Sequence, residues 1–168
     1  MSSISAAPSM TSIGRGAFEG CISLSSIYIP STVRFIDIQA FQSCGAMINV
    51  DSLNIKYSSL DGVLYNKTQT ILIQCPISKT GILILPSTVF SINDYACYQC
   101  TGLTSVKLPA RLKTIGRDSF SKCSNIASIR IPSSVTSIGS SAFSSCTKID
   151  SIIAFPVIPV NLNSSYNV

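Results

Sequence analysis

Hydrophobic side chains recur along this chain with a 23-residue period. The repeat is clearest in the cysteines, because Cys21 and Cys44 are 23 residues apart, as are Cys100, Cys123 and Cys146. A phenylalanine stands three residues before four of these cysteines. Self-similarity of this length is typical of a solenoid, in which each coil covers the open face of its neighbour.

Two inward-facing segments are predicted within each 23-residue coil. Val106 and Leu108 flank Lys107, so the two apolar side chains lie on one side of a strand and the cation on the other. A proline ends this strand, since it donates no hydrogen bond to a ladder. Leu112 and Ile115 then form a second inward ridge. The pattern predicts a mainly β repeat solenoid with a parallel sheet.

The period also indicates the domain organisation. We expect residues 1–168 to form a single repeat solenoid of about six coils. The chain starts in the second half of a coil and stops without a polar cap. Because solenoids require capped ends, we expect a fragment of a longer chain.

One irregular coil interrupts the regular pattern at residues 57–85. Two β-prone runs, residues 62–65 and 70–73, flank a polar turn at residues 66–69. They predict a β-hairpin that buds from the solenoid. This hairpin is either a contact element for a partner or a filler that keeps the coils in register.

The repeat resembles the BspA-like leucine-rich-repeat family, also called Treponema-type leucine-rich repeats. Residues 126–146 match the pattern of that family most closely, followed by 24–44 and 103–123, and residues 57–100 resemble its variant coil. Cys97 in the phenylalanine position and residues 50–52 depart from the pattern. The resemblance implies a surface protein that binds host proteins or other cells, with no catalytic residues.

Composition argues against an enzyme. The chain has no histidine and one glutamate, so it lacks the commonest general base and the Ser-His and Cys-His arrangements. Its seven cysteines occur mostly at one repeated position, where in-register side chains make disulfide geometry strained, so we expect free buried thiols. Cys97 and Cys100 form a C-x-x-C, but without a second such pair a zinc site is not expected. We expect no catalytic residues, no metal and no cofactor.

Location is left open between two alternatives. The chain has no run of ~18 apolar residues, so no membrane insertion by this segment is expected. Its start lacks a secretion signal, which with the thiols favours a cytoplasmic protein. The family resemblance implies the cell surface or extracellular space. If the chain is secreted, Asn66 at the hairpin tip is the accessible glycosylation acceptor.

The outward residue of each predicted strand indicates where a partner would bind. These residues should stack into one row, and a row that mixes apolar and charged side chains is typical of partner-binding surfaces. The alternative is that the two isoleucines of the row face the hairpin or the terminal segment. The candidate partner-binding residues are Tyr28, Asp51, Ile84, Lys107, Arg130 and Ile153.

Two classes of function follow. The first is a non-catalytic module for cell-surface adhesion or protein–protein interaction through the sheet face. The second is an intracellular repeat scaffold. Residues 107–130 hold six cations and one acid, Asp118, and these cations wrap around the coil. This predicts weak polyanion binding, to sulfated polysaccharide, and no nucleic-acid binding, which needs a continuous basic stripe.

Overall fold

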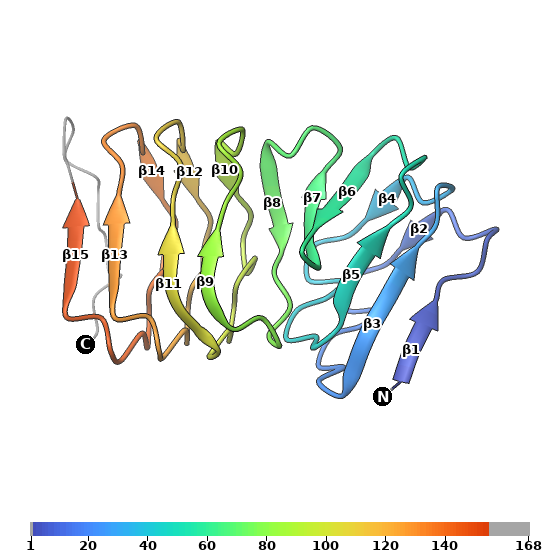
Figure 1. Ribbon diagram of the computed structural model, residues 1–168, viewed down its shortest axis with the longest axis horizontal. Coiled ribbons are helices and arrows are strands. Elements are labelled where there is room, and N and C mark those ends of the chain that lie inside the picture. Colours follow the sequence, from blue (N-terminus) through green and yellow to red (C-terminus); the bar gives the residue numbers. More distant parts are fainter. Residues whose placement is uncertain (1, 155–168) are drawn as a thin grey trace.

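Residues 2–154, which the computed structural model describes, form fifteen short strands and no helix (Figure 1). The strands recur once per coil on two faces of the molecule, and the coils stack side by side. This is the predicted β-solenoid. Among these residues there is accordingly no helix long and apolar enough to cross a bilayer.

The longer strands of successive coils pair in parallel on the first face. They form two separate sheets, ordered β1-β3-β5 and β9-β11-β13-β15, and Figure 1 shows the strands of the two sheets tilted relative to each other. The strands of the first sheet are β1 (Ser2–Ser5), β3 (Leu24–Ile29) and β5 (Met47–Val50). Those of the second are β9 (Gly81–Ile84), β11 (Leu103–Lys107), β13 (Ser128–Ile131) and β15 (Ser151–Ala154).

Two-residue strands form the second face, at the position of the second inward ridge. One sheet pairs β2 with β4, and the other continues β8 through β10, β12 and β14, all in parallel. The short strands are β2 (Ser12–Ile13), β4 (Phe35–Ile36), β10 (Ser91–Ile92), β12 (Thr114–Ile115) and β14 (Ser137–Ile138).

An antiparallel meander of three strands separates the two halves. It comprises β6 (Tyr57–Leu60), β7 (Val63–Asn66) and β8 (Ile71–Gln74). The predicted hairpin is therefore present as β7 and β8, and β6 adds a strand that the sequence pattern did not reveal. The hairpin does not bud outward, however, because Val63, Leu64 and Tyr65 are all buried.

Strand β7 lies between two hydrophobic cores. Leu64 packs in the core of the N-terminal coils, whereas its neighbours Val63 and Tyr65 pack in the core of the C-terminal coils. Strand β8 divides its side chains in the same way, with Leu72 in the C-terminal core and Ile73 against the N-terminal one. Alternation along a strand thus gives each core one face of the hairpin.

The recurring phenylalanines and cysteines stack into columns inside the solenoid, which agrees with the expected burial of the thiols. Phe18 stacks on Phe41 with 5.2 Å between ring centroids, and Phe120 stacks on Phe143 at 5.6 Å. Cys123 in the next column donates a hydrogen bond from Sγ to a carbonyl oxygen of the preceding coil, at 3.0 Å. The seven cysteines are all free thiols.

A pair of left-handed residues, four positions apart, turns each regular coil after the second-face strand. Non-glycine residues with positive φ are costly, since the side chain crowds the backbone. Their recurrence shows that the coil geometry imposes this conformation on whatever residue stands there. The pairs without glycine are Gln39 and Ser43, Tyr95 and Gln99, Asp118 and Lys122, and Ser141 and Ser145.

Candidate binding face

Four of the six candidate residues stand in register on the outer side of the second sheet. Ile84 on β9 pairs with Lys107 on β11, and Arg130 on β13 pairs with Ile153 on β15. All four are exposed. Ile84 is 61% exposed, so the hairpin does not cover it. The alternative for Ile153 was that the terminal segment covers it. That segment lies outside the described residues.

A cleft of about 530 Å³ opens between β11 and β13, in the middle of this row. The two strands are held there by a single residue pair, Val106 with Ile129. Lys107 and Arg130, the next residue on each strand, both line the cleft. Two cations beside a cleft attract a carboxylate or another anionic group. The remaining lining includes Ser105, Leu108, Ser128, Pro132 and Ser133.

The structure does not place Asp51 in the row, which corrects the sequence-based prediction. The residue in register with Tyr28 is Asn49, and Asp51 follows the end of β5. This strand pairs with an offset of 21 residues instead of 23, because two residues are missing from the turn before it. Gly45 makes the shorter turn possible, since a Cβ there would lie 2.3 Å from the carbonyl oxygen of Ile22.

Tyr28 and Asp51 nevertheless contact each other. The Tyr28 hydroxyl donates a hydrogen bond of 2.8 Å to Oδ2 of Asp51. The backbone N–H of Leu53 donates to the same carboxylate at 2.9 Å. The Leu53 bond, followed by the Tyr28 bond, lowers the pKa of Asp51. This pair forms a second, separate polar feature on the first sheet.

The turn between β6 and β7 separates that pair from the cationic cleft. Leu60 and Asp61 lie between the two sheets of the first face, and the Nζ of Lys79 donates a hydrogen bond of 2.9 Å to the carbonyl oxygen of Asp61. The predicted six-residue row is therefore two groups. Only the group of Ile84, Lys107, Arg130 and Ile153 is continuous, and we call it the cationic row.

The other cations of residues 107–130 lie away from the cationic row. Arg111 and Lys113 are exposed in the connection between β11 and β12. Arg117 lies over the Tyr95 ring at 5.2 Å, and Lys122 over the Tyr98 ring at 5.1 Å. These contacts hold the last two cations on the turn face, in cation–π geometry.

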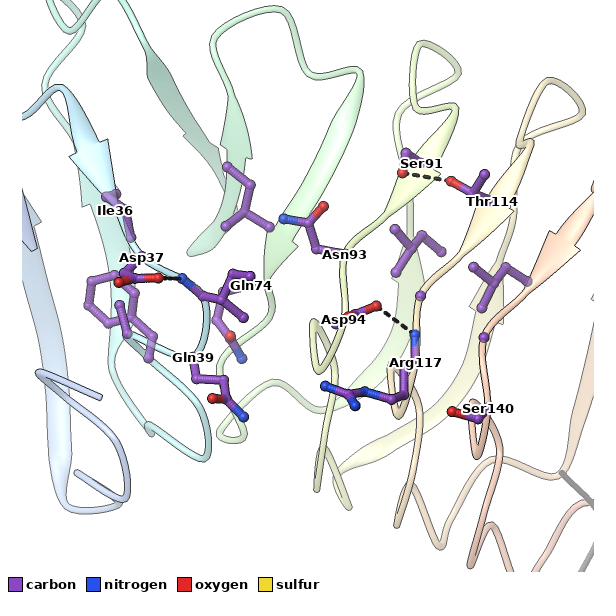
Figure 2. Close-up of a pocket in the computed structure, with 18 of the residues that line it drawn as sticks. Ile36, Asp37, Gln39, Gln74, Ser91, Asn93, Asp94, Thr114, Arg117 and Ser140 are labelled. Carbon is purple, nitrogen blue, oxygen red and sulfur yellow. Dashed lines mark hydrogen bonds between the residues drawn. The ribbon is translucent and has the colours of Figure 1, made fainter. Parts of the chain in front are cut away.

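A groove of about 620 Å³ on the second face escaped the sequence analysis (Figure 2). It lies where the irregular coil lacks the left-handed turn that every regular coil has, between the turn that follows β4 and the turn that follows β10. No residue pattern predicts it, because it results from an absent segment. The polar residues that Figure 2 shows around it include Asp37, Gln39, Gln74, Asn93, Asp94 and Arg117.

The predicted glycosylation acceptor is part of a turn. Asn66 ends β7, is half-buried, and accepts hydrogen bonds at Oδ1 from the backbone N–H groups of Thr70 and Ile71. Its Nδ2 donates to the Thr70 hydroxyl at 2.7 Å. The side-chain nitrogen that would carry a glycan therefore already donates a hydrogen bond within the turn. In residues 2–154 no group of three His, Cys, Asp or Glu side chains is placed to hold a metal ion.

Comparison with known proteins identifies the repeat. A family model for the BspA type leucine rich repeat region matches residues 1–82 and 69–165, in six copies. A comparison with curated protein sequences gives no match.

Three solved structures share the fold over most of the chain. A leucine-rich repeat protein from Eubacterium ventriosum is 26% identical, with a TM-score of 0.75 over 94% of this chain and 55% of that one. The pneumococcal vaccine antigen PcpA is 18% identical, with a TM-score of 0.76 over 90% and 50%. A leucine rich cell surface protein from Faecalibacterium prausnitzii is 22% identical, with a TM-score of 0.63 over 99% and 63%. This chain thus spans 50% to 63% of their lengths.

Proposed function

Because the chain belongs to the BspA-type leucine-rich repeat family, we propose that it is a protein-binding module that recognises its partner through the cationic row. Proteins of this repeat class present a parallel sheet as an extended contact surface. The observation that carries the proposal is the in-register, exposed order of Ile84, Lys107, Arg130 and Ile153, with a cleft at its centre.

The chemistry of the row suits an acidic and apolar protein surface. The two cations would pair with a carboxylate seated in the cleft, which steers association and fixes orientation. The isoleucines at the two ends would bury apolar area once a partner covers them. The partner is therefore expected to present an acidic residue flanked by apolar ones.

The family resemblance supports a location at the cell surface, with an adhesive role. Two of the structural relatives are described as a vaccine antigen and a cell surface protein, but at 18% and 22% identity they support only the fold. One observation favours the alternative, an intracellular scaffold: all seven thiols are free, which is typical of reducing compartments. Protease treatment of intact cells distinguishes the two, because only a surface protein is cleaved.

Two charge-matched double variants test the binding face. Each removes one lysine and one arginine: Lys107→Ser with Arg130→Ser in the cationic row, and Arg111→Ser with Lys113→Ser outside it. Capture of proteins from a host-cell surface extract is compared with capture by the unmodified chain. We expect the row variant to lose its partner and the other variant to keep it. The reverse result would show that the partner does not bind at the cationic row.

A further inference from the structure

The groove on the second face has a wall of unpaired backbone groups, and this suggests a ligand site separate from the cationic row. Regular coils are joined by a ladder in which N–H groups of one turn donate to carbonyl oxygens of the next. Phe18 donates to Ala40 in this way at 2.8 Å, and Phe120 to Ala142 at 2.8 Å. In the C-terminal coils the ladder is complete, and the N–H groups of Tyr95, Cys97 and Gln99 all donate to the next turn.

At the groove the ladder is broken. The N–H groups of Gln39 and Phe41 correspond to the ladder donors of the other coils, but they have no backbone acceptor among residues 2–154. On the opposite wall, Ala96 accepts from Cys75 of the irregular coil. The carbonyl oxygen of Asp94, a ladder acceptor by its position, has no donor in the same residues. The groove therefore offers donors on one wall and an acceptor on the other.

Side chains around the groove are held in place by contacts outside it. Oε1 of Gln39 accepts two hydrogen bonds from Arg15, at 3.0 and 2.8 Å, which leaves Nε2 to donate into the groove. The Arg117 guanidinium is held over Tyr95. Figure 2 shows the Asn93 amide and the Arg117 side chain extending from their wall toward the other. The contacts that hold Gln39 and Arg117 in place reduce the entropic cost of binding a ligand.

The groove is closed at one end. The Ser43 hydroxyl donates a hydrogen bond of 2.7 Å to Oε1 of Gln99, which joins the two walls directly. An extended peptide that ran through the groove would have to break this contact. A ligand that enters by its end is therefore favoured over a continuous strand.

Charge and polarity narrow the ligand further. The charged residues of the lining are two carboxylates, Asp37 and Asp94, and one guanidinium, Arg117, so the groove repels polyanions. The exposed side chain of Ile38 gives the rim an apolar surface. Hydroxyl groups both donate and accept, which matches walls that present donors and acceptors. We propose that the groove binds the terminal sugars of a neutral glycan.

The test is a titration of the ¹⁵N-labelled chain with neutral disaccharides: lactose, maltose, cellobiose and chitobiose. We expect at least one to shift the amide resonances of Gln39 and Phe41, with a Kd on the order of 1 mM. Asn93→Ala combined with Arg117→Ala should weaken this binding about tenfold, through lost hydrogen bonds to the sugar. Asn49→Ala with Arg111→Ala is the matched control, on other surfaces, and should leave it unchanged.

Three outcomes would overturn the proposal. In the first, none of the disaccharides moves these resonances. In the second, binding survives the groove variant, or the shifts fall on β11 and β13. In the third, short peptides move the two amides and sugars do not. Thermal melts of both variants confirm that the fold is intact. Because the cationic row is not altered in any of these variants, failure here leaves the protein-binding proposal untouched.

Discussion

Phe120 and Phe143 stack with their rings inclined by 2° and their centroids 5.6 Å apart, one ring from each of two successive coils. Phe120→Ala should cost roughly 3 to 5 kcal/mol of unfolding free energy, because it leaves a cavity in a layer that neighbouring coils share. Urea denaturation measures the change. Ser133→Ala at an exposed position should change stability by less than ~0.5 kcal/mol, and equal losses would contradict the assigned layering.

Ser119→Ala should stabilise the protein by about 1 kcal/mol. The Ser119 hydroxyl is buried without a hydrogen-bond partner, and a buried unsatisfied polar group is costly. The other regular coils have alanine at this position, which shows that the site accommodates a methyl group. Ser128→Ala, at an exposed position on β13, is the control and should be neutral. A lower melting temperature for Ser119→Ala would mean that its hydroxyl is satisfied in solution.

Ser141→Gly should also stabilise the fold, by roughly 0.5 to 1 kcal/mol. Ser141 has a φ of 57°, where glycine avoids the side-chain penalty at some entropic cost in the unfolded chain. The same substitution at Ser133, which does not have positive φ, should destabilise by about 0.5 to 1 kcal/mol. Chemical denaturation of both variants checks the pair. The explanation fails if both substitutions change the unfolding free energy in the same direction.

Stability should fall at alkaline pH because of the buried thiols. Burial raises the pKa of Cys146 to about 11 and also raises the pKa of Cys123, while thiols of the unfolded chain ionise at about 8.5. The contribution of these protonated thiols is therefore complete below about pH 8.5 and is lost as the pH rises toward the folded-state pKa. Urea midpoints measured from pH 7 to pH 10 test this. Cys146→Ala should flatten the decline, and an unchanged slope would contradict the assignment.

The same burial should protect the thiols from reagents. In the native protein at pH 7, a thiol reagent should react slowly with the five buried cysteines, and after denaturation without reductant it should detect most of the seven. Three intact disulfides would contradict the structure.

Binding to sulfated polysaccharide should be weak and should disappear in ~0.3 M salt, where the Debye length is about 5 to 6 Å. The cations wrap around the coil, so both charge-matched double variants should elute earlier from a heparin column, by similar amounts. A large loss in one variant alone would show a localised polyanion site.

The repeat carried most of the fold prediction, because a core position recurs whenever a coil does. The columns of Phe120 and Cys123 were predictable for this reason. The 23-residue period misplaced Asp51, because two residues are missing from the turn before β5 and shift its register. The left-handed pairs were not predictable, because residues as different as Tyr95 and Lys122 occupy them.

The candidate site was less predictable than the fold. Lys107 and Arg130 could be placed by strand alternation alone, whereas the cleft between them depends on how far two strands separate. The groove depends on a turn that the irregular coil lacks. Neither feature leaves a periodic signal in the sequence.

Strand β7 has a consequence for how the molecule comes apart. A solenoid with uniform coils unzips from an end, since each coil depends only on its neighbours. Here Leu64 faces one core and Tyr65 the other, so a single strand seals the inner end of both stacks. When one half unfolds, the meander can still cover the core of the other half. The protein is therefore expected to unfold in two cooperative steps, with β7 as the boundary between the two units.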